Sequence, residues 1–250
     1  MLDALIAALG TQGLLWLSFM SFTAGLVRGF SGFGSGMVLL PATVAALGPV
    51  GGITAMTIAD LTGPLPILRR AMREVHLPDL ARLLGATAIA LPLGVWVLLL
   101  IEPIIFRYIL SAVALATLVL LMSGFRYRGA LTPPLVLTTS GLAGFLGGAV
   151  GVPGPPIITL YLASTQPAFV VRATILLYLV VYDLLLLGIY AANGRLLLDA
   201  LWIGVLLSVP NIIGNVAGAA IFRPSLEGFY RVVAYAIIAF SALSALPVWD

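Results

Sequence analysis

The sequence predicts an all-α polytopic membrane protein built from two related halves. Two observations carry this prediction: the chain is too apolar for a soluble domain, and two similar glycine-rich breaks interrupt long apolar runs. Of the 250 residues, 62% are hydrophobic and 8% are charged, and the mean hydropathy is +1.18. Soluble domains carry about 25% charged residues, so this chain lacks the polar surface that water requires. Apolar runs of roughly 20 residues predict transmembrane helices instead.

Composition also excludes several functional classes. The chain has no cysteine, which rules out disulfides and thiolate metal sites, and its single histidine cannot form a histidine cluster. We therefore expect no metal and no cofactor. All 12 basic residues are arginine, and they are scattered along loops instead of forming a stripe, so the net charge of +3 does not indicate a nucleic-acid partner. Loop arginines in a membrane protein record its orientation.

Each half contains five apolar segments in the same order. In the first half they cover about residues 11–27, 37–47, 52–68, 83–101 and 105–122. In the second half they cover about residues 134–150, 157–164, 170–192, 200–221 and 229–246. We assign residues 1–125 to a first repeat and residues 131–250 to a second, with a linker at about 124–133. The second segment of each half is too short to span a bilayer. We expect it to pair with its predecessor, either as a re-entrant hairpin or as a short crossing, leaving three transmembrane helices per repeat.

The distribution of arginine predicts that the two repeats are inverted. Three further crossings after each broken pair would invert the second half, whereas treating each break as a kink within one crossing gives four crossings and parallel halves. Leaving Arg28 aside, the inverted arrangement places nine arginines on one face and two on the other. Those nine are Arg69, Arg70, Arg73, Arg82, Arg126, Arg128, Arg172, Arg223 and Arg231. The positive-inside rule favours this arrangement, with both termini outside the cytoplasm.

The two breaks are the predicted substrate site. Sliding the chain by 119 positions superposes Ala24-Gly25 on Ala143-Gly144, Gly29 on Gly148 and Gly32 on Gly151. Paired helix breaks in corresponding positions of two halves point to a transporter binding site. A helix amino terminus presents unpaired N–H groups and the positive end of the helix dipole, and such ends bind anions. Inverted halves would aim two such ends at the membrane midplane, so we expect a small anion there.

The predicted substrate-binding residues in the breaks supply backbone N–H groups, hydroxyls or a preset helix start. They are Ser31, Gly32, Gly34, Ser35, Gly36, Gly151, Pro153 and Gly154. Proline suits the first turn of a helix, which favours a helix start after the second break. The competing interpretation is that the glycines only permit close helix packing, as small residues often do in membranes.

Several polar residues inside or beside apolar segments complete the set. Asp60 and Asp183 fall in the third segment of their halves, and an intramembrane carboxyl group has either a structural partner or a functional task such as proton coupling. Arg28 precedes the first break and is either an anion ligand or the partner of Asp60. Asn211 and Asn215 are four residues apart and share one helical face, where they either line the cavity or bond neighbouring helices.

Other charged residues are expected to be ordinary surface groups. We interpret Arg172 as a cytoplasmic anchor, with direct substrate contact as the alternative. Glu74, His76 and Asp79 are expected to belong to a solvated loop.

The two motifs resemble those of the sulfite exporter TauE/SafE family of bacterial membrane permeases. The first is Gly29-Phe30-Ser31-Gly32-Phe33-Gly34-Ser35-Gly36, leading to Pro41, and the second runs from Gly147 to Pro156. Family members often carry three successive glycines where this chain has Gly34-Ser35-Gly36, and the second motif here is unusually rich in proline. The resemblance implies a protein that moves sulfite, sulfonates or other small organic anions across the inner membrane.

The expected function is therefore secondary transport of a small anion by alternating access, with protons as the candidate coupling ion and the lipid bilayer as surroundings. The same residues also fit a passive anion channel. An intramembrane enzyme is disfavoured, because the sequence offers no metal cluster and no nucleophile–histidine pair.

Overall fold

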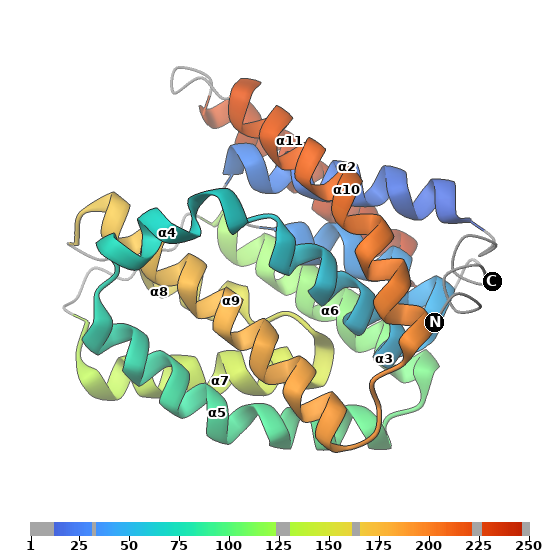
Figure 1. Cartoon of the computed structure of the whole chain (residues 1–250), viewed down its shortest axis with the longest axis horizontal. Helices are drawn as coiled ribbons and strands as arrows, with labels where there is room; N and C mark the ends of the chain where they lie inside the picture. The colour runs from blue at the N-terminus through green and yellow to red at the C-terminus, as the bar shows by residue number, and fades with distance from the viewer. Residues whose placement is uncertain (1–12, 32–33, 124–130, 162–165, 222–226, 247–250) are drawn as a thin grey trace. The chain divides into compact units, whose positions relative to one another are not determined.

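The computed structural model describes residues 13–31, 34–123, 131–161, 166–221 and 227–246, which form α-helices joined by short connections (Figure 1). The helices are α2 (Leu14–Ser31), α3 (Ser35–Thr62), α4 (Leu65–Glu74), α5 (Leu77–Leu100), α6 (Pro103–Met122), α7 (Pro133–Val150), α8 (Gly154–Tyr161), α9 (Ala168–Ala192), α10 (Leu198–Ile221) and α11 (Glu227–Ser244). The all-helical prediction is confirmed for this part of the chain.

Six of these helices, α3, α5, α6, α7, α9 and α10, are long and apolar enough to cross a membrane. Large apolar side chains such as Ile89, Val119 and Val216 are more than 60% exposed on them, which a lipid environment accommodates and water does not. The prediction of a multi-pass membrane protein is confirmed.

The helices form two compact units, and each unit is described by itself. The first unit contains α2, α3, residues 103–118 of α6, α10 and α11. The second contains α4, α5, α7, α8 and α9 as far as residue 189. Each unit therefore takes helices from both halves of the sequence.

Helix α3 is folded back on itself at Gly48. This glycine has φ 70° and ψ 176°, a backbone conformation that residues with a side chain rarely adopt, and Pro49 follows it directly. A Cβ atom on Gly52 would lie 2.6 Å from the backbone of Val44, so the chain after the turn packs tightly on the chain before it.

A hydrogen bond at the open end of this hairpin confirms the reversal. The Ser35 hydroxyl donates to Asp60, 25 residues along the chain, at 2.8 Å, whereas a straight helix would separate them by about 37 Å. The two limbs, residues 35–47 and 49–62, are each about 20 Å long and shorter than the hydrocarbon core of about 30 Å. Although its length and composition suit a span, α3 is thus a hairpin of two short helices. We expected the short segment 37–47 to pair with its predecessor, but its hairpin partner is the segment that follows, because Gly48-Pro49 turns the chain there.

Glycines bring α2 and α10 into backbone contact in the first unit (Figure 1). A Cβ atom added to Gly25 would collide with the carbonyl group of Asn211, and one added to Gly29 would collide with that of Asn215. On the opposite side of the crossing, Gly218 faces the Leu26 carbonyl group in the same way. Small residues let helices approach closely enough for dense packing in a membrane.

The second unit contains a matching crossing between α5 and α7. Gly144 lies against the backbone of Thr87, Gly148 against the carbonyl group of Leu91, and Gly94 against that of Phe145. The glycines on α7 follow those on α2 by 119 positions, and the facing residues on α10 follow those on α5 by 124. One contact pattern therefore occurs in both units, each time between a helix from one half of the sequence and a helix from the other.

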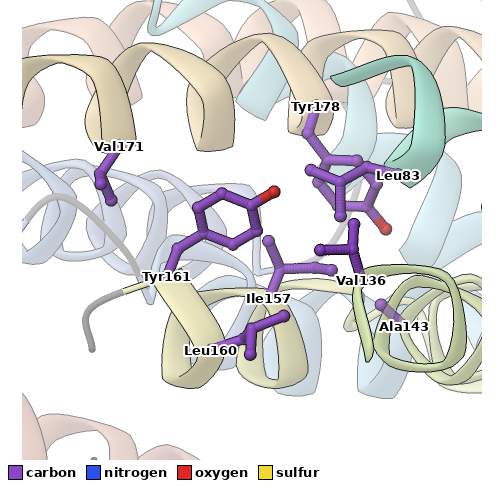
Figure 2. Packing of buried hydrophobic residues seen from close by; sticks show 8 residues of the cluster. All are labelled: Leu83, Val136, Ala143, Ile157, Leu160, Tyr161, Val171 and Tyr178. Carbon is purple, nitrogen blue, oxygen red and sulfur yellow. The ribbon is translucent and has the colours of Figure 1, made fainter. Parts of the chain in front are cut away.

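Side chains from α5, α7, α8 and α9 form an apolar core in the second unit. Figure 2 shows its members, which are Leu83, Val136, Ala143, Ile157, Leu160, Tyr161, Val171 and Tyr178. Among its few polar contacts, the Thr87 hydroxyl lies 3.1 Å from the Tyr178 hydroxyl and donates to the Ser140 carbonyl oxygen at 3.1 Å. This core fixes the short helix α8, and with it the second break.

Replacing Gly94 with alanine should destabilise the protein by roughly 1–3 kcal/mol, because the new methyl group would collide with the backbone of Phe145 and Ala149. Gly85, on the same helix, is exposed and has nothing within 4 Å of the Cβ position, so Gly85→Ala should be neutral or slightly stabilising. Thermal unfolding in detergent compares the two variants. Equal midpoints would contradict the packing role of Gly94.

Candidate functional site

An ion pair joins the last turn of α2 to the last turn of α3 in the first unit. Arg28 Nη1 lies 3.2 Å from Asp60 Oδ1 and also donates to the Asp60 carbonyl oxygen at 3.2 Å. The two side chains are 10% and 15% exposed, so both charges are largely removed from solvent. Removing one partner of such a pair would leave an uncompensated charge in an apolar surrounding. Arg28 therefore is the partner of Asp60 in this conformation.

Helix α3 contributes two buried hydroxyl groups, Ser35 at the start of its first limb and Thr57 one turn before Asp60 in its second. Ser35, 4% exposed, donates its hydroxyl to Asp60 Oδ2 at 2.8 Å, so one carboxylate contacts both a cation and a hydroxyl group. Thr57 is fully buried and its hydroxyl has no hydrogen-bond partner among the described residues. The sequence reasoning missed Thr57, although its position three residues before Asp60 puts both on one helical face.

The amide side chains of α10 face the end of α3 just beyond Asp60. A Cβ atom on Gly63 would lie 3.1 Å from Asn215 Nδ2 and 3.4 Å from Asn211 Oδ1. Asn211 is fully buried, its Nδ2 donates to the Ser21 carbonyl oxygen at 3.5 Å, and its Oδ1 has no partner among the described residues. The structure thus brings Asn211 and Asn215 into the same region as Arg28 and Asp60.

The amino terminus of α3 offers backbone donors beside these side chains. Gly34, with φ 91°, precedes the helix and provides no side-chain cap. Val38 is bonded to the Gly34 carbonyl oxygen, so the N–H groups of Ser35, Gly36 and Met37 belong to the unpaired first turn. Gly32 lies outside the described residues, as does the side chain of Ser31, whose backbone ends α2.

The second break offers fewer unpaired backbone N–H groups than the first. Gly151, with φ 74°, ends α7, and its N–H donates to the Gly147 carbonyl oxygen at 2.8 Å. Pro153 is buried, and Gly154 begins α8, whose second and third residues are Pro155 and Pro156. Proline has no N–H, so the first turn of α8 has fewer free donors than that of α3.

The predicted site residues are therefore divided between the two units. Arg28, Ser35, Asp60, Asn211 and Asn215 gather in the first unit. Gly151, Pro153, Gly154 and Asp183 belong to the second unit, where Asp183 is 8% exposed on α9.

Asp79 corrects one expectation. We expected it in a solvated loop, but it is 3% exposed in the first turn of α5. It accepts hydrogen bonds from Arg82 Nη1 at 3.2 Å and from Gln166 Nε2 at 2.9 Å, and His76 Nδ1 lies 3.1 Å from it. The neighbouring polar residues satisfy the carboxylate, which is why it can be buried at a helix start. These contacts attach α5 to the segment after α8, which is a structural role.

Replacing Arg28 with glutamine should destabilise the protein by roughly 3–5 kcal/mol, because Asp60 would keep a buried charge without its cation. The double variant Arg28→Gln/Asp60→Asn removes both charges and should regain much of that loss. Thermal unfolding of Arg28→Gln, Asp60→Asn and the double variant gives the coupling free energy between the two side chains. Arg195→Gln, at an exposed position, serves as the control. A double variant no more stable than Arg28→Gln would show that the pair is not what holds these helices.

Comparison with known proteins places this geometry in a family. Residues 17–245 match the profile of the family described as sulfite exporter TauE/SafE, a range that includes both breaks and every site residue discussed above. Searches of curated proteins and of solved structures each found no match. The family resemblance predicted from the two glycine-rich motifs is confirmed, and the match covers nearly the whole chain. The chain belongs to the sulfite exporter TauE/SafE family of membrane transport proteins.

Proposed function

We propose that this protein is a secondary transporter that carries a small anion, sulfite or a related sulfonate, across the bacterial inner membrane by alternating access. The family and the long apolar helices support transport across a membrane. The glycine contacts repeated in both units support the two-repeat organisation, for which we propose the inverted arrangement that the arginine distribution favours.

The observation that carries the proposal is the buried cation Arg28 at the break between α2 and α3. A guanidinium group presents five N–H donors in a planar fork that suits the oxygens of carboxylate, sulfite or sulfonate groups. The unpaired N–H groups of the first turn of α3 and the hydroxyl of Ser35 are further donors, and the helix dipole favours negative charge at the same end. We place the anion at this end of α3, with Asn211, Asn215 and Thr57 as additional polar contacts.

Asp60 couples anion binding to proton binding in this mechanism. An ionised Asp60 neutralises Arg28 and holds the Ser35 hydroxyl, so it occupies the donors that an anion needs. A proton on the carboxyl group removes that competition. Arg28 and Ser35 then bind the anion, and the net charge of the site stays at zero. Keeping that charge at zero avoids the cost of an unpaired ion within the membrane. Asp183 is the second proton-coupling candidate.

Binding and transport assays test the function directly. Thermal unfolding of the purified protein against sulfite, sulfate, thiosulfate, sulfoacetate, taurine and simple carboxylates should identify stabilising anions, because a ligand of the native state raises apparent stability. In proteoliposomes, an imposed inward proton gradient should drive accumulation of the stabilising anion beyond equilibrium. A passive channel would only equilibrate it. Stabilisation by uncharged or cationic compounds alone would contradict the anion site.

Replacing Asp60 with asparagine should make anion binding independent of pH, because Arg28 is then never neutralised by a carboxylate. The wild-type protein should bind the anion more tightly as the pH falls. The double variant Arg28→Gln/Asp60→Asn, which keeps the site uncharged, should lose binding by at least about tenfold at every pH, since a hydrogen bond to a charged group contributes about 1.5–3 kcal/mol. Isothermal titration of each variant over a pH series measures both effects. If Asp60→Asn retained the wild-type pH dependence, another group would be the proton acceptor.

A further inference from the structure

A cavity of about 510 Å³ lies between α4 and the beginning of α9 in the second unit. Its lining combines three charged side chains, Arg70, Glu74 and Arg172, with apolar ones that include Ala71, Phe169 and Ala173. None of the residues that line the cavity belongs to the ion pair of α2 and α3. Its volume falls in the range of pockets that hold small ligands.

The charges of the cavity favour an anion. Arg70 Nε donates to Glu74 Oε1 at 2.7 Å, which uses one of the five donors of the guanidinium group. The hydrogen bond that Arg70 donates to Glu74 raises the pKa of Arg70, and its guanidinium group stays charged. Arg172 is exposed and makes no ion pair among the described residues. The cavity lining thus carries two positive charges and one negative charge, and the negative charge of Glu74 is already paired with Arg70.

The apolar lining of the cavity adjoins the contact between α4 and α9. Ala71 is 5% exposed and Ala173 is 4% exposed, and both belong to a small apolar cluster in which α4 packs against α9. Phe169, which also lines the cavity, is 53% exposed. A ligand that combines a negative group with hydrocarbon matches this lining better than an inorganic ion does.

The position of the cavity along α9 matches the headgroup region of a bilayer. Phe169 is the first residue of the apolar stretch that makes α9 a candidate span, so Arg172 lies within one turn of the end of that stretch. Helix α4 carries Arg69, Arg70 and Arg73 together with the exposed apolar residues Leu65 and Met72, which is the composition of a helix lying in the membrane interface.

We propose that this cavity binds the phosphate group of an anionic phospholipid, with Arg70 and Arg172 holding the phosphate oxygens and Phe169, Ala71 and Ala173 contacting the adjacent hydrocarbon. Basic pockets beside transmembrane helices bind anionic headgroups by this chemistry. The site carries no part of the proposed anion transport, and its occupant is a component of the membrane.

The test measures thermal unfolding of the protein in nanodiscs of phosphatidylcholine with increasing fractions of phosphatidylglycerol. The midpoint should rise with the phosphatidylglycerol fraction, because this lipid binds the native state. Arg70→Gln and Arg172→Gln should each weaken the apparent affinity for phosphatidylglycerol about fivefold, and Arg172→Lys should weaken it less because the charge is kept. Arg69→Gln is the matched control, since Arg69 is an exposed arginine of the same helix that does not line the cavity.

Three results would overturn the proposal. An equal loss in Arg69→Gln would indicate diffuse attraction to a basic surface. Equal stabilisation by inorganic phosphate in detergent would indicate a site for free anions. The absence of any dependence on phosphatidylglycerol would exclude an anionic lipid. Unfolding midpoints in pure phosphatidylcholine show whether each variant folds. If a glutamine variant does not fold, the lysine variant at the same position, Arg70→Lys or Arg172→Lys, is measured in its place.

Discussion

Close approach of helix backbones is the constraint on which the rest of this structure depends. In a bilayer, an apolar side chain gains little by leaving lipid for a neighbouring helix, so association relies on dense packing. The α2–α10 and α5–α7 crossings meet this requirement with glycines that face carbonyl groups. The first crossing also positions the candidate site, because Asn211 and Asn215 contribute both the carbonyl groups that face the glycines and the amide groups that face the end of α3. Packing and polar chemistry thus share the same residues.

The two breaks share a backbone pattern but differ in charge. Gly147 stands 119 positions after Arg28, and its Cα is covered by the ring of Tyr182, so the second unit has an aromatic side chain beside the position that corresponds to the guanidinium group. Prolines also remove N–H donors from the start of α8. The two breaks therefore share glycine positions but differ in the charge and in the N–H donors beside them. We assign recognition of the negative charge to the first break for this reason.

Much of the fold was predictable because the relevant signals are local. Hydropathy located nearly every helix, and glycine and proline located both breaks. The two predicted short segments correspond to the limb of α3 that ends at Leu47 and to helix α8. The hairpin partner was predicted wrongly, since hydropathy does not reveal that Gly48 has a positive φ and reverses the chain. Asp79 was misplaced because its partner Gln166 lies 87 residues away, and such distant contacts leave no pattern in a single sequence. The grouping of Arg28, Asp60 and Asn211 was foreseeable only in part, as intramembrane polar residues tend to find one another.

The division of the chain between the two units also bears on the order in which they can assemble during synthesis. In the second unit, Thr87 and the Ser140 carbonyl group that it contacts are 53 residues apart. In the first, the Ser21 hydroxyl donates to the carbonyl oxygen of Leu207, 186 residues later. The glycine face of α2 therefore cannot pack against α10 until the ribosome has made α10. Domains are generally completed in the order of the chain, but here the unit that begins first is completed last, so the Arg28–Asp60 pair can form before the helix that encloses it exists.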